Sequence, residues 1–93
     1  MKILDTEKLT EFADDHADVR KRLSKWRSAV ELAEWKNPVE MGDEFPKADL
    51  VSPQTVFDIA SNRIITIIDY EQQIVLVDYV LTHDEYMRGK RRR

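Results

Sequence analysis

The chain has 93 residues, of which 42% are hydrophobic and 35% are charged, and its net charge is −3. This length supports a single domain, because two cores would each be too small to fold alone, and the composition excludes a disordered chain. Cysteine is absent, which excludes disulfides and cysteine-bound zinc, and no apolar run approaches the roughly 20 residues that span a bilayer. The first residues lack the apolar segment of a signal peptide, so we expect a cytoplasmic protein without a membrane partner.

The N-terminal segment begins extended and then becomes helical. Residues 1–4 are expected to form a short edge strand. Leu9, Phe12 and Ala13 follow at helical spacing, which predicts a first helix over about residues 6–16.

A second helix is the clearest element of the sequence. Asp18 is in position to cap it, and the residues that follow place one apolar stripe on a single face. The stripe consists of Val19, Leu23, Trp26, Val30 and Ala33. Asn37-Pro38 is expected to end the helix, because the residue before a proline is pushed out of the α region.

The C-terminal half has the pattern of a connecting loop followed by strands. Residues 37–55 contain all three prolines and predict a loop, which Phe45 and Leu50 are expected to anchor to the core. Strands are predicted over residues 56–59, 63–70 and 74–81, with turns at 60–62 and 71–73. Such short connections require antiparallel pairing.

This order of elements predicts the α+β class. We expect two N-terminal helices packed on one face of a small antiparallel β-sheet, because helices that precede a run of strands collect on one side of it. Residues 1–87 are expected to form the single domain, and residues 88–93 a basic C-terminal tail.

Charge is distributed unevenly along the chain. Five of its fifteen cations lie in the last six residues, and they are Arg88, Lys90, Arg91, Arg92 and Arg93. Residues 1–87 therefore hold ten cations against eighteen anions, a balance of −8. Phosphate neutralisation supplies most non-specific nucleic-acid affinity, so an RNA contact must be local, and the tail is its expected carrier. The alternative is a solvated end without a ligand.

Four short segments form a recognisable series. They are residues 35–38 (Trp-Lys-Asn-Pro), 56–59 (Val-Phe-Asp-Ile), 62–63 (Asn-Arg) and 82–86 (Thr-His-Asp-Glu-Tyr). In this order and spacing they resemble the patterns W-K-x-P, V-F-N-I, asparagine followed by a basic residue, and T-H-x-E-Y of the HigB branch of RelE/ParE-like bacterial toxins. The fold of that family is similar to the predicted layout.

The resemblance implies a toxin of a type II toxin–antitoxin system, a metal-independent endoribonuclease that cleaves messenger RNA on the ribosome and needs no cofactor. It also implies a HigA-like antitoxin partner with a helix-turn-helix domain. The chain departs from the family pattern at three places. Ala60-Ser61-Asn62 stands for G-G-N, Ile64-Ile65 replaces tyrosine-arginine and so removes a cation, and Met87 replaces an aspartate.

Cleavage of RNA without a metal needs a base for the ribose 2′-hydroxyl, an acid for the leaving 5′-oxygen, and cations for the charge on phosphorus. His83 suits the acid or base role, because histidine changes charge near neutral pH; the alternative is a strand-end histidine that caps backbone groups. Arg63 either binds phosphate oxygens with its planar fork or forms a surface salt bridge. Tyr86 either stacks on a base or donates a proton, or else packs over the sheet edge. Glu85 either orients His83 or is solvated.

Further contacts are expected from residues other than the predicted catalytic residues His83, Arg63 and Tyr86. Lys36 and Asn62 are predicted to bind RNA together with the tail. Arg20, Lys21 and Arg22 form a cationic patch on the second helix, which we expect to bind acidic antitoxin residues, because complementary patches set encounter and register. Pairing of these cations with nearby carboxylates is the alternative.

Two other functions stay open at this point. One is a catalytically weak module that keeps the fold and binds an antitoxin or the ribosome without cutting RNA, which the missing cation and the acidic body favour. The other is a ParE-like protein that binds gyrase. No metal-ligand cluster, glycine-rich phosphate loop or nucleophile elbow is present in the sequence.

Overall fold

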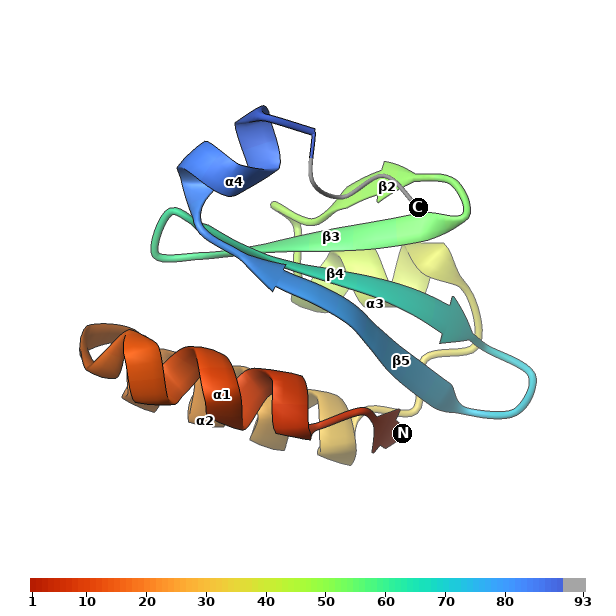
Figure 1. The fold of residues 1–93 in the computed structure, drawn as a ribbon. Coiled ribbons are helices and arrows are strands. Elements are labelled where there is room, and N and C mark those ends of the chain that lie inside the picture. The colour runs from red at the N-terminus through yellow and green to blue at the C-terminus, as the bar shows by residue number, and fades with distance from the viewer. Residues whose placement is uncertain (90–93) are drawn as a thin grey trace.

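The computed structural model describes residues 1–89 and confirms the α+β class (Figure 1). Within this range, five strands form one sheet in the spatial order β1-β5-β4-β3-β2. They are β1 (Lys2–Leu4), β2 (Asp49–Val51), β3 (Gln54–Ile59), β4 (Asn62–Asp69) and β5 (Ile74–Leu81). The helical elements are α1 (Glu7–Asp15), the 3₁₀ turn η1 (Ala17–Val19), α2 (Arg20–Leu32), α3 (Pro38–Glu44) and α4 (His83–Met87).

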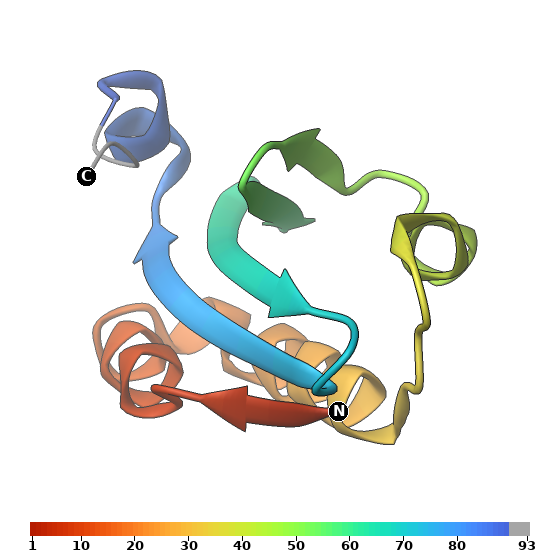
Figure 2. The ribbon, with the colours of Figure 1, turned by 90° about the vertical axis from the view of Figure 1, so that its right-hand side faces the viewer.

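Helices cover the two faces of the sheet unequally. Helices α1 and α2 lie side by side along one face, as expected, and α3 contributes Met41 to the same core (Figure 1). Trp26 is buried in that core, which confirms that the apolar stripe of the second helix is its buried face. On the other face the sheet curls upward, and only the short helix α4 lies near it within the described residues (Figure 2).

The sheet is mixed rather than purely antiparallel. The meander β3-β4-β5 pairs antiparallel as predicted, and β1 is the expected edge strand, but β1 pairs parallel with β5. The amino group of Met1 explains this direction, because it donates to the backbone oxygens of Val30, Glu31 and Ala33 at the end of α2. A cation is favoured at a helix C-terminus, so the start of the chain is held there and β1 must run away from it.

The second helix is shorter than predicted. Asp18 does not cap it, since the residue lies in η1 and α2 begins at Arg20 without a side-chain cap. Asn37-Pro38 does not end it either, because α2 has already ended at Leu32. Instead Asn37 caps α3, where its Oδ1 accepts the backbone N–H of Glu40 over 2.9 Å. Proline fits the first position of a helix, because its missing N–H has no partner there.

The predicted loop over residues 37–55 is therefore wrong in part, since it contains α3 and β2. Phe45 anchors this segment as expected, with its ring edge-on to the rings of Trp35 and Phe57. Leu50 does not, because 59% of it is exposed. Met41, which is buried, is the anchor that the sequence interpretation missed.

One turn and one β-bulge in the meander set which side chains face α4. Ala60 and Ser61 both have positive φ, 51° and 69°, as a two-residue hairpin turn with the strand twist requires. Later in the meander, Ile65 pairs with Tyr79 and Thr66 with Val77, so Asp78 is the extra residue of a β-bulge. A bulge reverses the alternation of faces. Val77 consequently packs against the helices, whereas Tyr79 packs on the opposite face.

Candidate functional site

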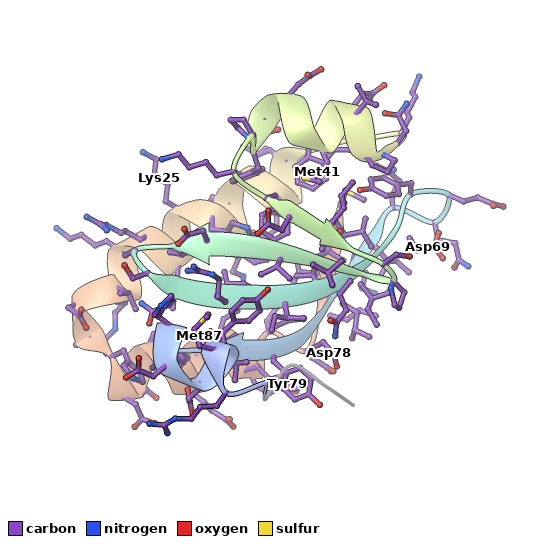
Figure 3. The ribbon with its side chains drawn as sticks, turned by 90° about the horizontal axis from the view of Figure 1, so that it is seen from above. Lys25, Met41, Asp69, Asp78, Tyr79 and Met87 are labelled. Atoms are coloured by element: carbon purple, nitrogen blue, oxygen red, sulfur yellow. The ribbon has the colours of Figure 1, made fainter. Side chains whose placement is uncertain are left out.

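The candidate site lies where β4 begins and β5 ends, because Arg63 and Leu81 are paired across the sheet. The chain then leaves β5 through Thr82 and enters α4, which therefore sits beside Arg63. Figure 3 views this face, with α4 and Met87 in front of the strands. The register thus brings two of the predicted catalytic residues, Arg63 and Tyr86, into contact.

Arg63 is held by three described contacts. Its Nη1 donates to Asp58 Oδ1 over 2.9 Å and to the backbone oxygen of Asn62 over 3.2 Å. Its Cζ lies 5.5 Å from the centroid of the Tyr86 ring, within the range of a cation–π interaction. The side chain is only 17% exposed. Arg63 is thus both a partner in a salt bridge and a preoriented guanidinium.

Helix α4 owes its position to a capping box. The backbone N–H of Glu85 donates to Thr82 Oγ1 over 3.2 Å, and the backbone N–H of Thr82 donates to Glu85 Oε1 over 3.0 Å. The carboxylate of Glu85 thus caps the helix, so neither of the two expectations for Glu85, orienting His83 or standing free in solvent, is met. The Thr-x-x-Glu spacing is a known helix-start signal, and it was readable from the sequence.

His83 is the first residue of α4 and is exposed. Thr82, not His83, supplies the side-chain cap of α4. Tyr86 lies three residues later, and residues at this spacing share one side of a helix. The exposed imidazole of His83 and the phenol of Tyr86 therefore project from the same side of α4, and the Tyr86 ring contacts the Arg63 guanidinium.

Tyr86 also packs on a small apolar cluster, which we call the second-face cluster. It consists of Val51, Val56, Ile65, Tyr79, Leu81 and Tyr86. Tyr86 is half-buried there, so packing over the sheet is part of its role. Packing of Tyr86 on this cluster fixes α4 against the sheet. Such support is needed where functional side chains project from a helix of only five residues.

The predicted RNA-binding residues do not all gather here. Asn62 lies beside Arg63, but its Nδ2 donates to the backbone oxygen of Ala60 over 3.3 Å, so its side chain holds the turn. Arg88 is exposed at the end of α4. Lys90, Arg91, Arg92 and Arg93 lie outside the described residues.

Lys36 lies at the opposite end of the sheet. Its neighbour Trp35 accepts a hydrogen bond through its backbone oxygen from Gln73 Nε2, over 2.7 Å, and Gln73 belongs to the turn between β4 and β5. The length of β4, about 3.3 Å for each residue, separates that turn from Arg63. The structure therefore does not bring Lys36 together with the candidate site.

The cationic patch on α2 is exposed. Arg20 pairs weakly with Asp14 over 3.7 Å, whereas Lys21 and Arg22 make no ion pair within residues 1–89. All three lie in the first turn of α2, where cations oppose the helix dipole. The patch thus does not serve the stability of its own helix.

Sequence reasoning missed Asp58. It was noted as part of the predicted strand over residues 56–59 but was given no role, although a two-residue turn at 60–61 places residues 58 and 63 opposite each other. Counting back from that turn would have predicted the pair.

The described residues contain neither a metal-binding cluster nor a membrane-spanning helix. No group of three or more His, Asp or Glu side chains among residues 1–89 gathers closely enough to hold a metal ion. No helix in that range is long and apolar enough to cross a membrane.

Comparison with known proteins identifies the family. The sequence pattern of the HigB toxin family, described as the RelE-like toxic component of a toxin–antitoxin system, matches residues 19–89. A search of curated proteins finds no match to the chain. The family match covers all strands of the meander together with α2, α3 and α4. The chain therefore belongs to the HigB family of RelE-like toxins, the toxic components of toxin–antitoxin systems.

Proposed function

We propose that the protein is a ribosome-dependent endoribonuclease, which inhibits translation by cutting messenger RNA. The observation that carries this proposal is the contact between Arg63 and the Tyr86 ring, with His83 exposed three residues before Tyr86 on the same helix. An exposed imidazole, a phenol and a preoriented guanidinium are the kinds of side chain that supply proton transfer and charge neutralisation in metal-independent cleavage of RNA.

In this reaction the ribose 2′-oxygen attacks the adjacent phosphorus, and the bond to the 5′-oxygen breaks. The 2′-proton leaves to a base and the 5′-oxygen gains a proton from an acid, so the products are a 2′,3′-cyclic phosphate and a 5′-hydroxyl. His83 takes the 2′-proton as the base, and the Tyr86 hydroxyl donates a proton to the 5′-oxygen as the acid. Arg63 neutralises charge on the phosphate oxygens, and the cation–π contact with the Tyr86 ring stabilises the position of the guanidinium.

Expression of the lone chain with primer-extension mapping of cellular messenger RNA tests this proposal. We expect growth arrest together with new 5′ ends inside translated regions, and their loss when translation initiation is blocked. Growth arrest with intact messenger RNA would instead support the second candidate, a module that binds the ribosome or gyrase without cutting. That candidate is favoured by Ile64 and Ile65, which are fully buried and supply no second cation.

The basic tail is proposed to hold ribosomal RNA. A chain that stops after Gly89 loses four cations and keeps α4, whose last turn is closed by the N–H groups of Arg88 and Gly89. We expect weaker ribosome binding and a salt dependence (log K against log salt) that is shallower by about three, since each phosphate contact contributes about 0.7 for single strands. Binding measured at several salt concentrations checks this. An unchanged slope would show that the tail makes no phosphate contact.

An antitoxin partner follows from the family, and we propose that a helix-turn-helix antitoxin meets α2. A groove of about 490 Å³ runs beside this helix, lined by Arg22, Lys25 and Trp26 on one side and by Asp58 and Ile59 on the other. An acidic antitoxin segment on the patch would thus lie within reach of the candidate site.

Reversing the charge of Arg20, Lys21 and Arg22 to glutamate is expected to weaken antitoxin binding at least ten-fold at low salt, and less at high salt, because screening reduces the interaction. The helix itself should not suffer, since anions suit a helix N-terminus. Lys47→Glu is the matched control on another exposed surface. Unaltered affinity of the triple variant at low salt would eliminate α2 as the electrostatic anchor.

A further inference from the structure

Asp58 faces the one arginine of the candidate site. The two residues are direct partners in the β3–β4 register, and the ion pair between them is 2.9 Å long. The side chain of Asp58 is 42% exposed, compared with 17% for that of Arg63. Asp58 is thus the more accessible partner, and a phosphate that approaches Arg63 also meets this carboxylate.

The contacts of Arg63 engage one part of its guanidinium only. Nη1 donates to Asp58 and to the backbone oxygen of Asn62, and the ring of Tyr86 lies against the group. Within residues 1–89, Nε and Nη2 donate no hydrogen bond. These two nitrogens form the straight edge of the guanidinium that can bind two phosphate oxygens side by side. The contacts therefore fix the group while its phosphate-binding edge stays available.

We propose that Asp58 is a positioning residue for this site: it orients Arg63 toward the scissile phosphate and, through its charge, keeps the affinity for RNA low. The proposal rests on the proposed function. It names Asp58 as the residue that sets how tightly the site binds RNA relative to how fast it cleaves it. Orientation comes from the hydrogen bond, because an arginine side chain otherwise has many rotamers to choose from. Low affinity comes from repulsion between the carboxylate and the phosphate.

The two effects can be separated by substitution. Asp58→Asn keeps an oxygen that accepts from Nη1 and removes the charge, whereas Asp58→Ala removes both. Asp43→Asn is the matched control, since Asp43 is an exposed carboxylate on α3 that makes no ion pair among the described residues.

Binding is measured with a single-stranded oligoribonucleotide that carries 2′-O-methyl groups and therefore cannot be cleaved. Turnover is measured on messenger RNA bound to ribosomes. We expect Asp58→Asn to bind the oligonucleotide about three- to ten-fold tighter than the parent and to keep clearly more turnover than Asp58→Ala. Asp58→Ala should gain similar affinity but lose at least ten-fold in turnover. The Arg63 Nε–H signal in NMR spectra should stay sharp in the asparagine variant and broaden in the alanine variant.

A merely structural salt bridge predicts another pattern, in which both variants lose stability and neither gains affinity. That pattern overturns the proposal, and so does equal turnover of the asparagine and alanine variants. If no protein in the series, including the parent, cuts RNA, then the proposed function is wrong. The oligonucleotide affinities and the Arg63 signal still decide the role of Asp58 in that case.

Discussion

Replacing His83 with alanine is expected to abolish growth arrest and to lower messenger-RNA cleavage by a factor of about 10² to 10⁴, the usual contribution of general acid–base catalysis. His83 is exposed at the first position of α4, and its side chain makes no hydrogen bond to another group among residues 1–89. The capping box of Thr82 and Glu85 holds the helix without it. We therefore expect an unchanged denaturation midpoint together with the loss of activity.

The other histidine provides the control. His16 stacks on the ring of Phe12, with centroids 4.0 Å apart, and its Nδ1 lies 3.1 Å from the Phe12 backbone oxygen. Its replacement by alanine should lower stability slightly and leave cleavage intact. Full toxicity of the His83 variant would show that the catalytic assignment is wrong. Unfolding of that variant would show instead that His83 is structural.

Replacing Phe57 with alanine is expected to cost about 3 to 5 kcal/mol of unfolding free energy, the typical loss for a buried phenylalanine. Phe57 is 1% exposed, and its ring meets the edges of Trp26 and Phe45 at centroid distances of 5.3 Å and 5.2 Å. It therefore joins α2 and the segment after α3 to the sheet. Small domains have about 5 to 15 kcal/mol in total, so this one change removes a large part of the stability.

Urea denaturation followed by circular dichroism measures this loss. Leu50→Ala is the control, because Leu50 is an apolar residue on the adjacent part of the sheet but is 59% exposed, and its truncation should cost about 0.5 kcal/mol or less. A loss below about 1 kcal/mol for Phe57→Ala would mean that the aromatic cluster is not the joint between the helices and the sheet.

Elements with a local, repeated residue pattern were predictable from the sequence. The stripe that contains Trp26 predicted the helix and its buried face, and the isoleucine- and valine-rich runs with short turns predicted the meander. These two predictions succeeded because the spacing of hydrophobic residues and the length of a turn depend on residues that are near neighbours in the sequence. The types of the site residues, His83, Tyr86 and Arg63, were likewise readable, since chemistry follows from the side chain.

The contacts between distant segments, in contrast, became known from the folded protein alone. The parallel direction of β1 depends on the Met1 amine reaching the end of α2, about thirty residues away along the chain. Asn37-Pro38 starts a helix rather than ending one, because the helix that follows buries Met41 in the core. Local propensity predicts neither the direction of β1 nor the start of α3, because each depends on contacts with a segment far away in the sequence.

The site shows the same division. The sequence placed Lys36 and Arg63 in one group of cations, but β4 separates them, because a strand carries its two ends to opposite edges of the domain. Conversely, Asp58 and Arg63 face each other only once the turn at residues 60–61 has set the register. Residue types thus predicted the chemistry, and strand register decided which of those residues can act together.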